Sequence, residues 1–206
     1  MSKTYIVGTG GFAREVLFLM DELNLYNEFS GFIEPDLIWE EKWRDKSIMG
    51  KPVLPFSNVK DFDRVSIGVA DSKMRRKTIT QLPSNIDYIS LIHPKASVSK
   101  WATLGKGAIV TAGCIVTTQI QIADHCHLNL GTTIGHDCVI GEFFTSAPAV
   151  NISGICNIGD DVYFGTGAAT KQGVTICNNV VIGMGAMVTK SISEPGTYIG
   201  IPAQKK

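Results

Sequence analysis

The residue pair best suited to proton transfer in this chain of 206 residues is His136 with Asp137. An imidazole titrates near neutral pH, and an adjacent carboxylate can orient the ring and raise its basicity. Such a pair suits the removal of a proton from an amine or hydroxyl as it attacks a thioester. On spacing alone, a surface histidine beside a surface aspartate is the simpler interpretation.

The composition narrows the class of protein in which this pair could act. Lys and Arg total 19 and Asp and Glu total 19, which argues against a nucleic-acid binder because such proteins carry a basic excess. No apolar run approaches the 18 residues or so of a membrane-spanning helix. The N-terminus leads into a strand-like run and resembles no signal peptide, so we expect a cytoplasmic protein without a membrane span.

The charges are unevenly spread, and a repeat explains why. Residues 98–192 hold only nine of the 38 charged residues. From Val98 to Val188, every sixth residue is aliphatic or aromatic in fourteen of sixteen cases, with Ser146 and Thr170 as exceptions. The position four residues later is mostly small or β-branched. A period of six fits neither an α-helix nor an alternating strand.

This repeat predicts a parallel β-helix in which three hexads close one triangular coil. The aliphatic residue points inward, the small one fits a crowded corner, and coils stack about 4.8 Å apart. Four of the five cysteines fall in the small column and are expected to be buried and reduced. An odd cysteine count also fits the cytosol.

The remaining histidines of the repeat do not form a metal-binding pattern. His125, His127 and His136 occupy three different positions of the hexad, and no C-x-x-C pair is present. We therefore expect no metal. His93 precedes a proline outside the repeat and is expected to close the linker.

The first half begins with a strand, a glycine-rich turn and a helix. Tyr5-Ile6-Val7 runs into Gly8-Thr9-Gly10-Gly11-Phe12-Ala13, and residues 14–21 have a helical pattern. This is the context that a G-x-G-x-x-[GA] nucleotide fingerprint requires, because the helix N-terminus offers N–H groups to a phosphate. A glycine turn that only packs helix on strand remains the alternative.

The rest of this half is expected to complete a small parallel α/β unit over residues 1–95. Strands are predicted at 29–33, 64–69 and 88–92, with a basic helix at 71–81. Glu34 follows the second strand, where an acidic ribose or base contact would lie, although a solvated loop charge fits as well. Arg75 is either on a solvated helix face or a phosphate contact.

Taken together, the chain resembles the hexapeptide-repeat nucleotide-sugar N-acetyltransferases, such as those acting on UDP-linked bacillosamine precursors or GDP-perosamine. The resemblance rests on four segments, which are 8–16, 92–94, 129–141 and 200–203. It implies a Rossmann-like nucleotide-sugar-binding domain over 1–95 and a left-handed β-helix over 96–206. It further implies a homotrimer with active sites between subunits, acetyl-CoA as co-substrate, and a role in bacterial surface glycan biosynthesis.

The resemblance also assigns site residues. His136 matches the general base, Asp137 the acidic neighbour that tunes it, and Asn129 an active-site asparagine. The residues expected to contact the nucleotide sugar are Gly10, Gly11, Phe12, Ala13, Glu34 or Asp36, Gly68 and Arg75. Those expected to line the acetyl-CoA groove are Thr145, Gly154, Thr166 and Met184, with Thr145 standing where some relatives have a second histidine.

Other functions remain open at this point. The acceptor is expected to be a 4-amino-4,6-dideoxyhexose, and the nucleotide base is not determined. One alternative is an O-acyltransferase or other acyl-CoA transferase of the sialic-acid type. Another is a non-catalytic trimer that binds a nucleotide sugar, against which the His136–Asp137 pair argues.

Overall fold

The computed structural model describes residues 3–206 and divides the chain into two compact units, one ending at Leu91 and one running from Ile92 to Lys206. The predicted boundary lay between residues 95 and 96. Each unit has a hydrophobic core of its own. Within the described range, no helix is long and apolar enough to cross a membrane.

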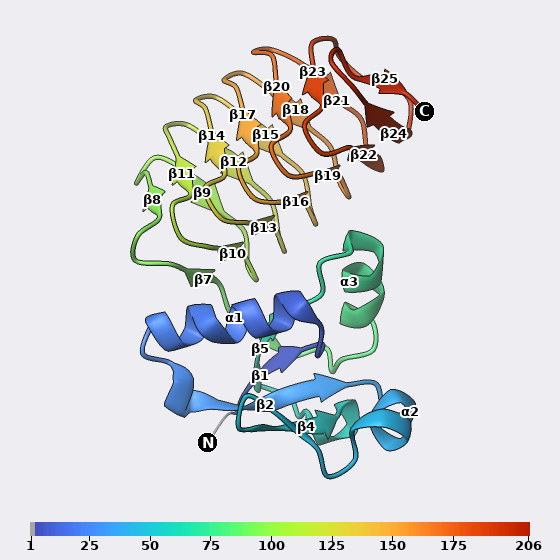
Figure 1. Ribbon diagram of the computed structural model, residues 1–206. Helices are drawn as coiled ribbons and strands as arrows, with labels where there is room; N and C mark the ends of the chain where they lie inside the picture. The colour runs from blue at the N-terminus through green and yellow to red at the C-terminus, as the bar shows by residue number, and fades with distance from the viewer. Residues whose placement is uncertain (1–2) are drawn as a thin grey trace. The chain divides into compact units, whose positions relative to one another are not determined.

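The first unit is built on a six-stranded sheet in the order β3-β4-β2-β1-β5-β6 (Figure 1). All neighbours pair in parallel except β3, which is antiparallel to β4. Every residue of the central strand β1 is buried, as is typical of parallel sheets covered on both faces. The strands are β1 (Thr4–Val7), β2 (Phe29–Glu34), β3 (Ser47–Ile48), β4 (Lys51–Pro55), β5 (Arg64–Ile67) and β6 (Asp87–Tyr88).

Helix α1 (Gly11–Glu22) buries one apolar stripe whose members are spaced three or four residues apart, as an amphipathic helix requires. Helix α3 (Ser72–Ile79) is capped by Asp71, whose Oδ1 accepts a 2.8 Å hydrogen bond from the Met74 backbone N–H. The shorter helical pieces are η1 (Tyr26–Glu28), α2 (Asp36–Ile38), the π-helical turn η2 (Trp39–Trp43) and η3 (Phe56–Asn58).

The strand predicted at 88–92 is wrong as one element, because the run changes hydrogen-bond partners midway. Ile89 N–H still donates a 3.1 Å hydrogen bond to the carbonyl oxygen of Val65 in the first sheet. His93 N–H instead donates to Val110 at 2.9 Å. The run is therefore split into β6 and β7 (Leu91–Ile92), and β7 lies in a sheet of the second unit.

The second unit is a stack of coils made of very short parallel strands (Figure 1). Strands pair in steps of 18 residues, as in Ile109 with His127 and Thr145 with Tyr163, so each coil takes three hexads. Three sheets form the three faces. The parallel β-helix predicted from the six-residue period is confirmed.

The strands of each face follow one another along the stack. The first face holds β7, β10 (Ile109–Val110), β13 (His127–Leu128), β16 (Thr145–Ser146), β19 (Tyr163–Phe164), β22 (Val180–Ile182), β24 (Gly196–Ile199) and β25 (Gln204–Lys205), with only β25 antiparallel. The second holds β8 (Ser97–Val98), β11 (Ile115–Val116), β14 (Thr133–Ile134), β17 (Asn151–Ile152), β20 (Ala169–Thr170) and β23 (Met187–Val188). The third holds β9 (Thr103–Leu104), β12 (Gln121–Ile122), β15 (Val139–Ile140), β18 (Asn157–Ile158) and β21 (Thr175–Ile176).

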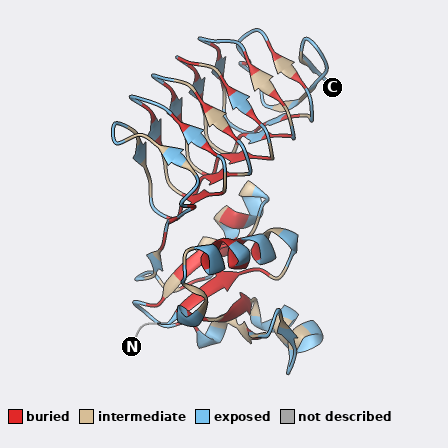
Figure 2. Cartoon of the chain, turned by 60° about the vertical axis from the view of Figure 1, so that its left-hand side comes forward, coloured by how far each residue is buried: buried red, intermediate tan, exposed pale blue. Residues whose placement is uncertain are grey.

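The two sequence columns form the interior of this β-helix, where buried positions recur along every coil (Figure 2). The two exceptions in the aliphatic column are satisfied by hydrogen bonds, since Ser146 Oγ lies 2.8 Å from Thr132 Oγ1 and Thr170 Oγ1 accepts from Ser153 N–H. Four cysteines are buried as free thiols, as predicted, and Cys177 is half-buried.

Candidate functional site

The glycine-rich turn of the first unit has the geometry of a backbone-lined ligand site. Gly8 has a φ of +93°, in the left-handed region that favours glycine. Gly10 and Gly11 are exposed at the start of α1, and a Cβ at Gly10 would meet nothing within 4 Å. No side chain caps α1 and its first turn holds no acidic residue, so the helix N-terminus favours an anion.

Ala13 and Gly68 serve to bring helix and strand together. A Cβ at Gly68 would lie 2.7 Å from Ala13 Cα and 2.8 Å from Ala13 Cβ, so only glycine allows this approach. Ala13 is fully buried and does not line the cavity beside the turn. Its predicted contact with a nucleotide sugar is therefore replaced by a packing role, whereas Gly68 both packs and lines the cavity.

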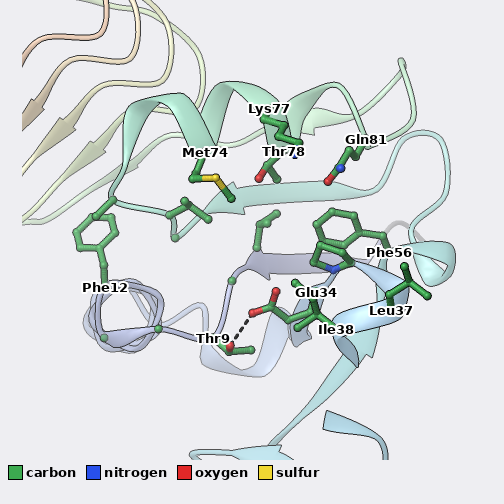
Figure 3. A pocket seen from close by; sticks show the side chains of 18 residues that line it. Thr9, Phe12, Glu34, Leu37, Ile38, Phe56, Met74, Lys77, Thr78 and Gln81 are labelled. Carbon is green, nitrogen blue, oxygen red and sulfur yellow. Dashed lines mark hydrogen bonds between the residues drawn. The ribbon is translucent and has the colours of Figure 1, made fainter. Parts of the chain in front are cut away.

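That cavity has a volume of about 570 Å³ and lies at the carboxyl ends of β1, β2 and β5, beside the start of α1. Figure 3 shows Glu34 pointing into it, with Thr9 Oγ1 donating a 2.5 Å hydrogen bond to Glu34 Oε1. Phe56 and Ile38 lie on one side, and Lys77, Thr78 and Gln81 project from α3 and the residues after it. The cavity thus combines apolar walls with one carboxylate, one ammonium group and an amide.

Two predicted contacts do not reach this cavity. The carboxylate of Asp36 is exposed and accepts a 2.9 Å hydrogen bond from Ser57 N–H, so Glu34 is the acidic residue of the site. Arg75 is fully buried, with Nη1 donating to the carbonyl oxygens of Val69 and Ala70 at 2.8 and 3.0 Å. It is neither on a solvated helix face nor among the cavity residues.

Several cavity residues were missed by the sequence reasoning. Lys77 stood out only as part of a basic run, and Phe56, Thr78 and Gln81 carried no signal at all. Which face of α3 turns toward the glycine-rich turn depends on tertiary packing, which a helix of eight residues does not reveal through its own pattern.

In the second unit, His136 and Asp137 form a direct pair. His136 Nδ1 lies 2.7 Å from Asp137 Oδ2, and both side chains are about half exposed. The carboxylate holds the Nδ1 edge, which leaves the Nε2 edge to exchange a proton with a ligand. The geometry fits a general base on the β-helix surface.

The other predicted residues of this unit are more dispersed. Asn129 Oδ1 accepts a hydrogen bond from the next backbone N–H, that of Leu130, at 2.9 Å, so it is engaged in its own turn. Thr166 and Met184 are exposed and 18 residues apart, one coil above the other.

The other two residues predicted to line the acetyl-CoA groove are not exposed. Thr145 is buried, which counts against the predicted contact with acetyl-CoA. Gly154 is also buried, and its nearest side chain is the His136 ring.

The other two histidines of the repeat are not exposed. His125 and His127 are buried, and the His125 ring stacks on Phe143 with centroids 5.1 Å apart. Within residues 3–206, no three His, Cys, Asp or Glu side chains gather as a metal site requires.

Comparisons with known proteins find similar sequences and structures. Residues 156–190 match the family described as the hexapeptide repeat of succinyl-transferase. Over 110 residues the chain is 34% identical to the GDP-perosamine N-acetyltransferase of Escherichia coli O157:H7, covering 53% of this chain and 50% of that protein. The chain resembles the hexapeptide-repeat nucleotide-sugar N-acetyltransferases, as its motifs predicted.

Two solved structures extend this resemblance to the whole length of the chain. The acetyltransferase domain of PglB from Neisseria gonorrhoeae is 27% identical, with full coverage of both chains and a TM-score of 0.90. PerB from Caulobacter crescentus, solved with CoA and GDP-perosamine, is 25% identical, with coverage of 100% and 98% and a TM-score of 0.84.

These similarities bear on the fold and on the class of enzyme. The parallel strands and the solved neighbours fit the predicted left-handed β-helix. The named relatives are acetyltransferases, which agrees with the prediction of an enzyme of the acyltransferase class. The chain spans half or less of the length of the first curated relatives that it matches.

Proposed function

We propose that the protein transfers the acetyl group of acetyl-CoA to the amine of a nucleotide-linked amino sugar. The observation that carries this proposal is the 2.7 Å contact between His136 Nδ1 and Asp137 Oδ2 on an otherwise charge-poor β-helix. The acceptor we favour is a 4-amino-4,6-dideoxyhexose, because one relative is named for GDP-perosamine and a solved neighbour contains it.

The first unit is proposed to hold the nucleotide as a Rossmann-like domain. Counted in chain order, its parallel strands have the order 3-2-1-4-5, and the cavity lies outside their carboxyl ends, where such folds bind ligands. The diphosphate would lie against the N-terminus of α1, where Gly10 and Gly11 allow close approach. Glu34 would accept hydrogen bonds from the ribose or base.

The second unit is proposed to carry the transfer step. The sugar amine attacks the thioester carbonyl carbon while His136 Nε2 takes a proton from the nitrogen. Backbone N–H groups stabilise the oxygen anion that forms. The carbon–sulfur bond then breaks, and CoA leaves as a thiol after receiving the proton. This route needs no acyl-enzyme, in keeping with buried cysteines.

The assembly and setting follow from the resemblance and are part of the proposal. We expect a cytoplasmic homotrimer in which acetyl-CoA lies between adjacent β-helices, and a role in bacterial surface glycan biosynthesis. Thr166 and Met184, exposed in successive coils, are the candidates retained for that groove.

A thiol-release assay tests the reaction directly. Acetyl-CoA is mixed with 4-amino-4,6-dideoxyhexoses linked to UDP, dTDP or GDP, and with the matching 4-hydroxy sugars, and free CoA is followed with a thiol reagent. We expect release only with an amino sugar, and a fall in kcat of about 10²- to 10⁴-fold for His136→Ala.

Gln172→Ala is the matched control, because Gln172 is an exposed residue two coils from His136 at the same corner. It should leave kcat unchanged. Near-normal turnover by His136→Ala at an unchanged molar mass in solution would refute the assignment of the base, and release with hydroxy sugars alone would replace N-transfer by O-transfer.

A further inference from the structure

Gly154 lies directly against the imidazole of His136, one coil further along the β-helix. A Cβ at Gly154 would be 2.7 Å from His136 Nε2, 2.9 Å from Cε1 and 3.0 Å from Cδ2. An approach along the ring edge would leave the two carbons clearly farther away than Nε2. The near-equal distances therefore put the absent side chain against the face of the ring, at its Nε2 end.

The backbone does not explain why this residue is glycine. Gly167 and Gly173 have φ values of +67° and +77° with nothing within 4 Å of a Cβ, so their conformation is what favours glycine. Gly154 is outside that left-handed region. Alanine could adopt its conformation, and the His136 ring is what excludes a Cβ.

The repeat supports this interpretation independently. The position two residues after each inward aliphatic residue is an outward corner position, and it holds His136 in one coil. Across the sixteen hexads that position is glycine only once, at Gly154, in the coil stacked next to His136. Elsewhere it carries side chains as large as lysine and methionine, so the position itself tolerates bulk.

We infer that Gly154 is a positioning residue that provides a flat surface for the His136 ring. Asp137 fixes the ring in its own plane through Nδ1, and Gly154 limits its tilt from one face. The two constraints together aim Nε2 along the surface of the β-helix. The importance of that aim for transfer rests on the proposed function, whereas the steric relation between the two residues does not.

A double-mutant cycle on thermal unfolding tests the steric relation. Gly154→Ala should lower Tm in the wild-type background, and the same substitution should have little effect in the His136→Ala background, where the excluding ring is gone. If Gly154→Ala alone fails to fold, the double variant should still fold. An equal loss in both backgrounds would overturn the inference, because the Cβ would then clash with the β-helix itself.

Kinetics and spectroscopy test the positioning role. Gly154→Ala should lower kcat by about 100-fold while changing the KM for either substrate little, since misplacement of a reacting group is enough for such a loss. Its His136 imidazole resonances should shift, whereas those of Gln172→Ala should match the wild type. An unchanged kcat with unshifted resonances would refute the role. Should His136→Ala stay active, the proposed function fails while the unfolding cycle still reports on the steric relation.

Discussion

The turn that carries His136 also accounts for its carboxylate partner. Asp137 has a φ of +59°, and aspartate is one of the few residues other than glycine that adopt this conformation readily. The same left-handed corner recurs every six residues along the β-helix, and Ile155 occupies it with a φ of +61°. A short carboxylate at the corner thus satisfies the backbone and holds the neighbouring imidazole.

Glu34 and Asp36 make a matched pair for testing the nucleotide site, because only the first lines the cavity. We expect Glu34→Ala to raise the KM for the nucleotide sugar by about 10-fold or more, since a charged hydrogen bond is lost, with kcat nearly unchanged. Asp36→Ala should leave both constants near wild type. Steady-state kinetics with each sugar nucleotide measures this, and an equal effect of the two substitutions would contradict the site.

At the scale of the elements, the segments with a strongly periodic sequence were predicted well. The hexads predicted the strands of the β-helix because an inward position recurs every six residues regardless of context. The glycine-rich turn predicted the start of α1. The run at 88–92 was misjudged because its local pattern does not say which sheet receives its hydrogen bonds. The burial of Arg75 and the orientation of Lys77 and Gln81 depend on packing between elements, which sequence spacing does not encode.

Two glycines at the ends of neighbouring elements should differ in how alanine at each position affects stability. Gly68→Ala should lower the free energy of unfolding by about 1–3 kcal/mol, because the new Cβ overlaps Ala13 where α1 meets the sheet. Gly10→Ala adds its Cβ in open space with an allowed φ of −71° and should leave unfolding nearly unchanged.

The same Gly10→Ala substitution should nevertheless raise the KM for the nucleotide sugar, because it adds bulk where a phosphate would approach the turn. Denaturant titration and steady-state kinetics separate the two effects. A Gly68→Ala variant as stable as the wild type would contradict the packing role of Gly68. A Gly10→Ala variant with an unchanged KM would contradict the phosphate contact proposed for the turn.

At the scale of the whole molecule, the neutral net charge conceals two different architectures. The first unit has an ordinary charged surface over a parallel sheet, whereas the β-helix must keep its inward columns apolar through every coil. The low charge of residues 98–192 follows from that requirement. All five cysteines lie in the β-helix, so thiol chemistry reports on this unit alone.

Thiol labelling should therefore distinguish an intact β-helix from an opened one. Burial raises the pKa of the Cys114 thiol, and the hydrogen bond with Cys156, followed by burial, raises the pKa of the Cys138 thiol. Both effects keep these two thiols protonated and slow to react near neutral pH, because the thiolate is the reactive form. The same hydrogen bond lowers the pKa of the Cys156 thiol to about 6, so that thiol is protected from reagents by its complete burial instead. In the native protein we expect only Cys177 to react promptly with a thiol reagent, and all five to react in guanidinium chloride. A Cys177→Ser variant should be inert until it unfolds, and prompt labelling of a further thiol in that variant would show that the coils open without global unfolding.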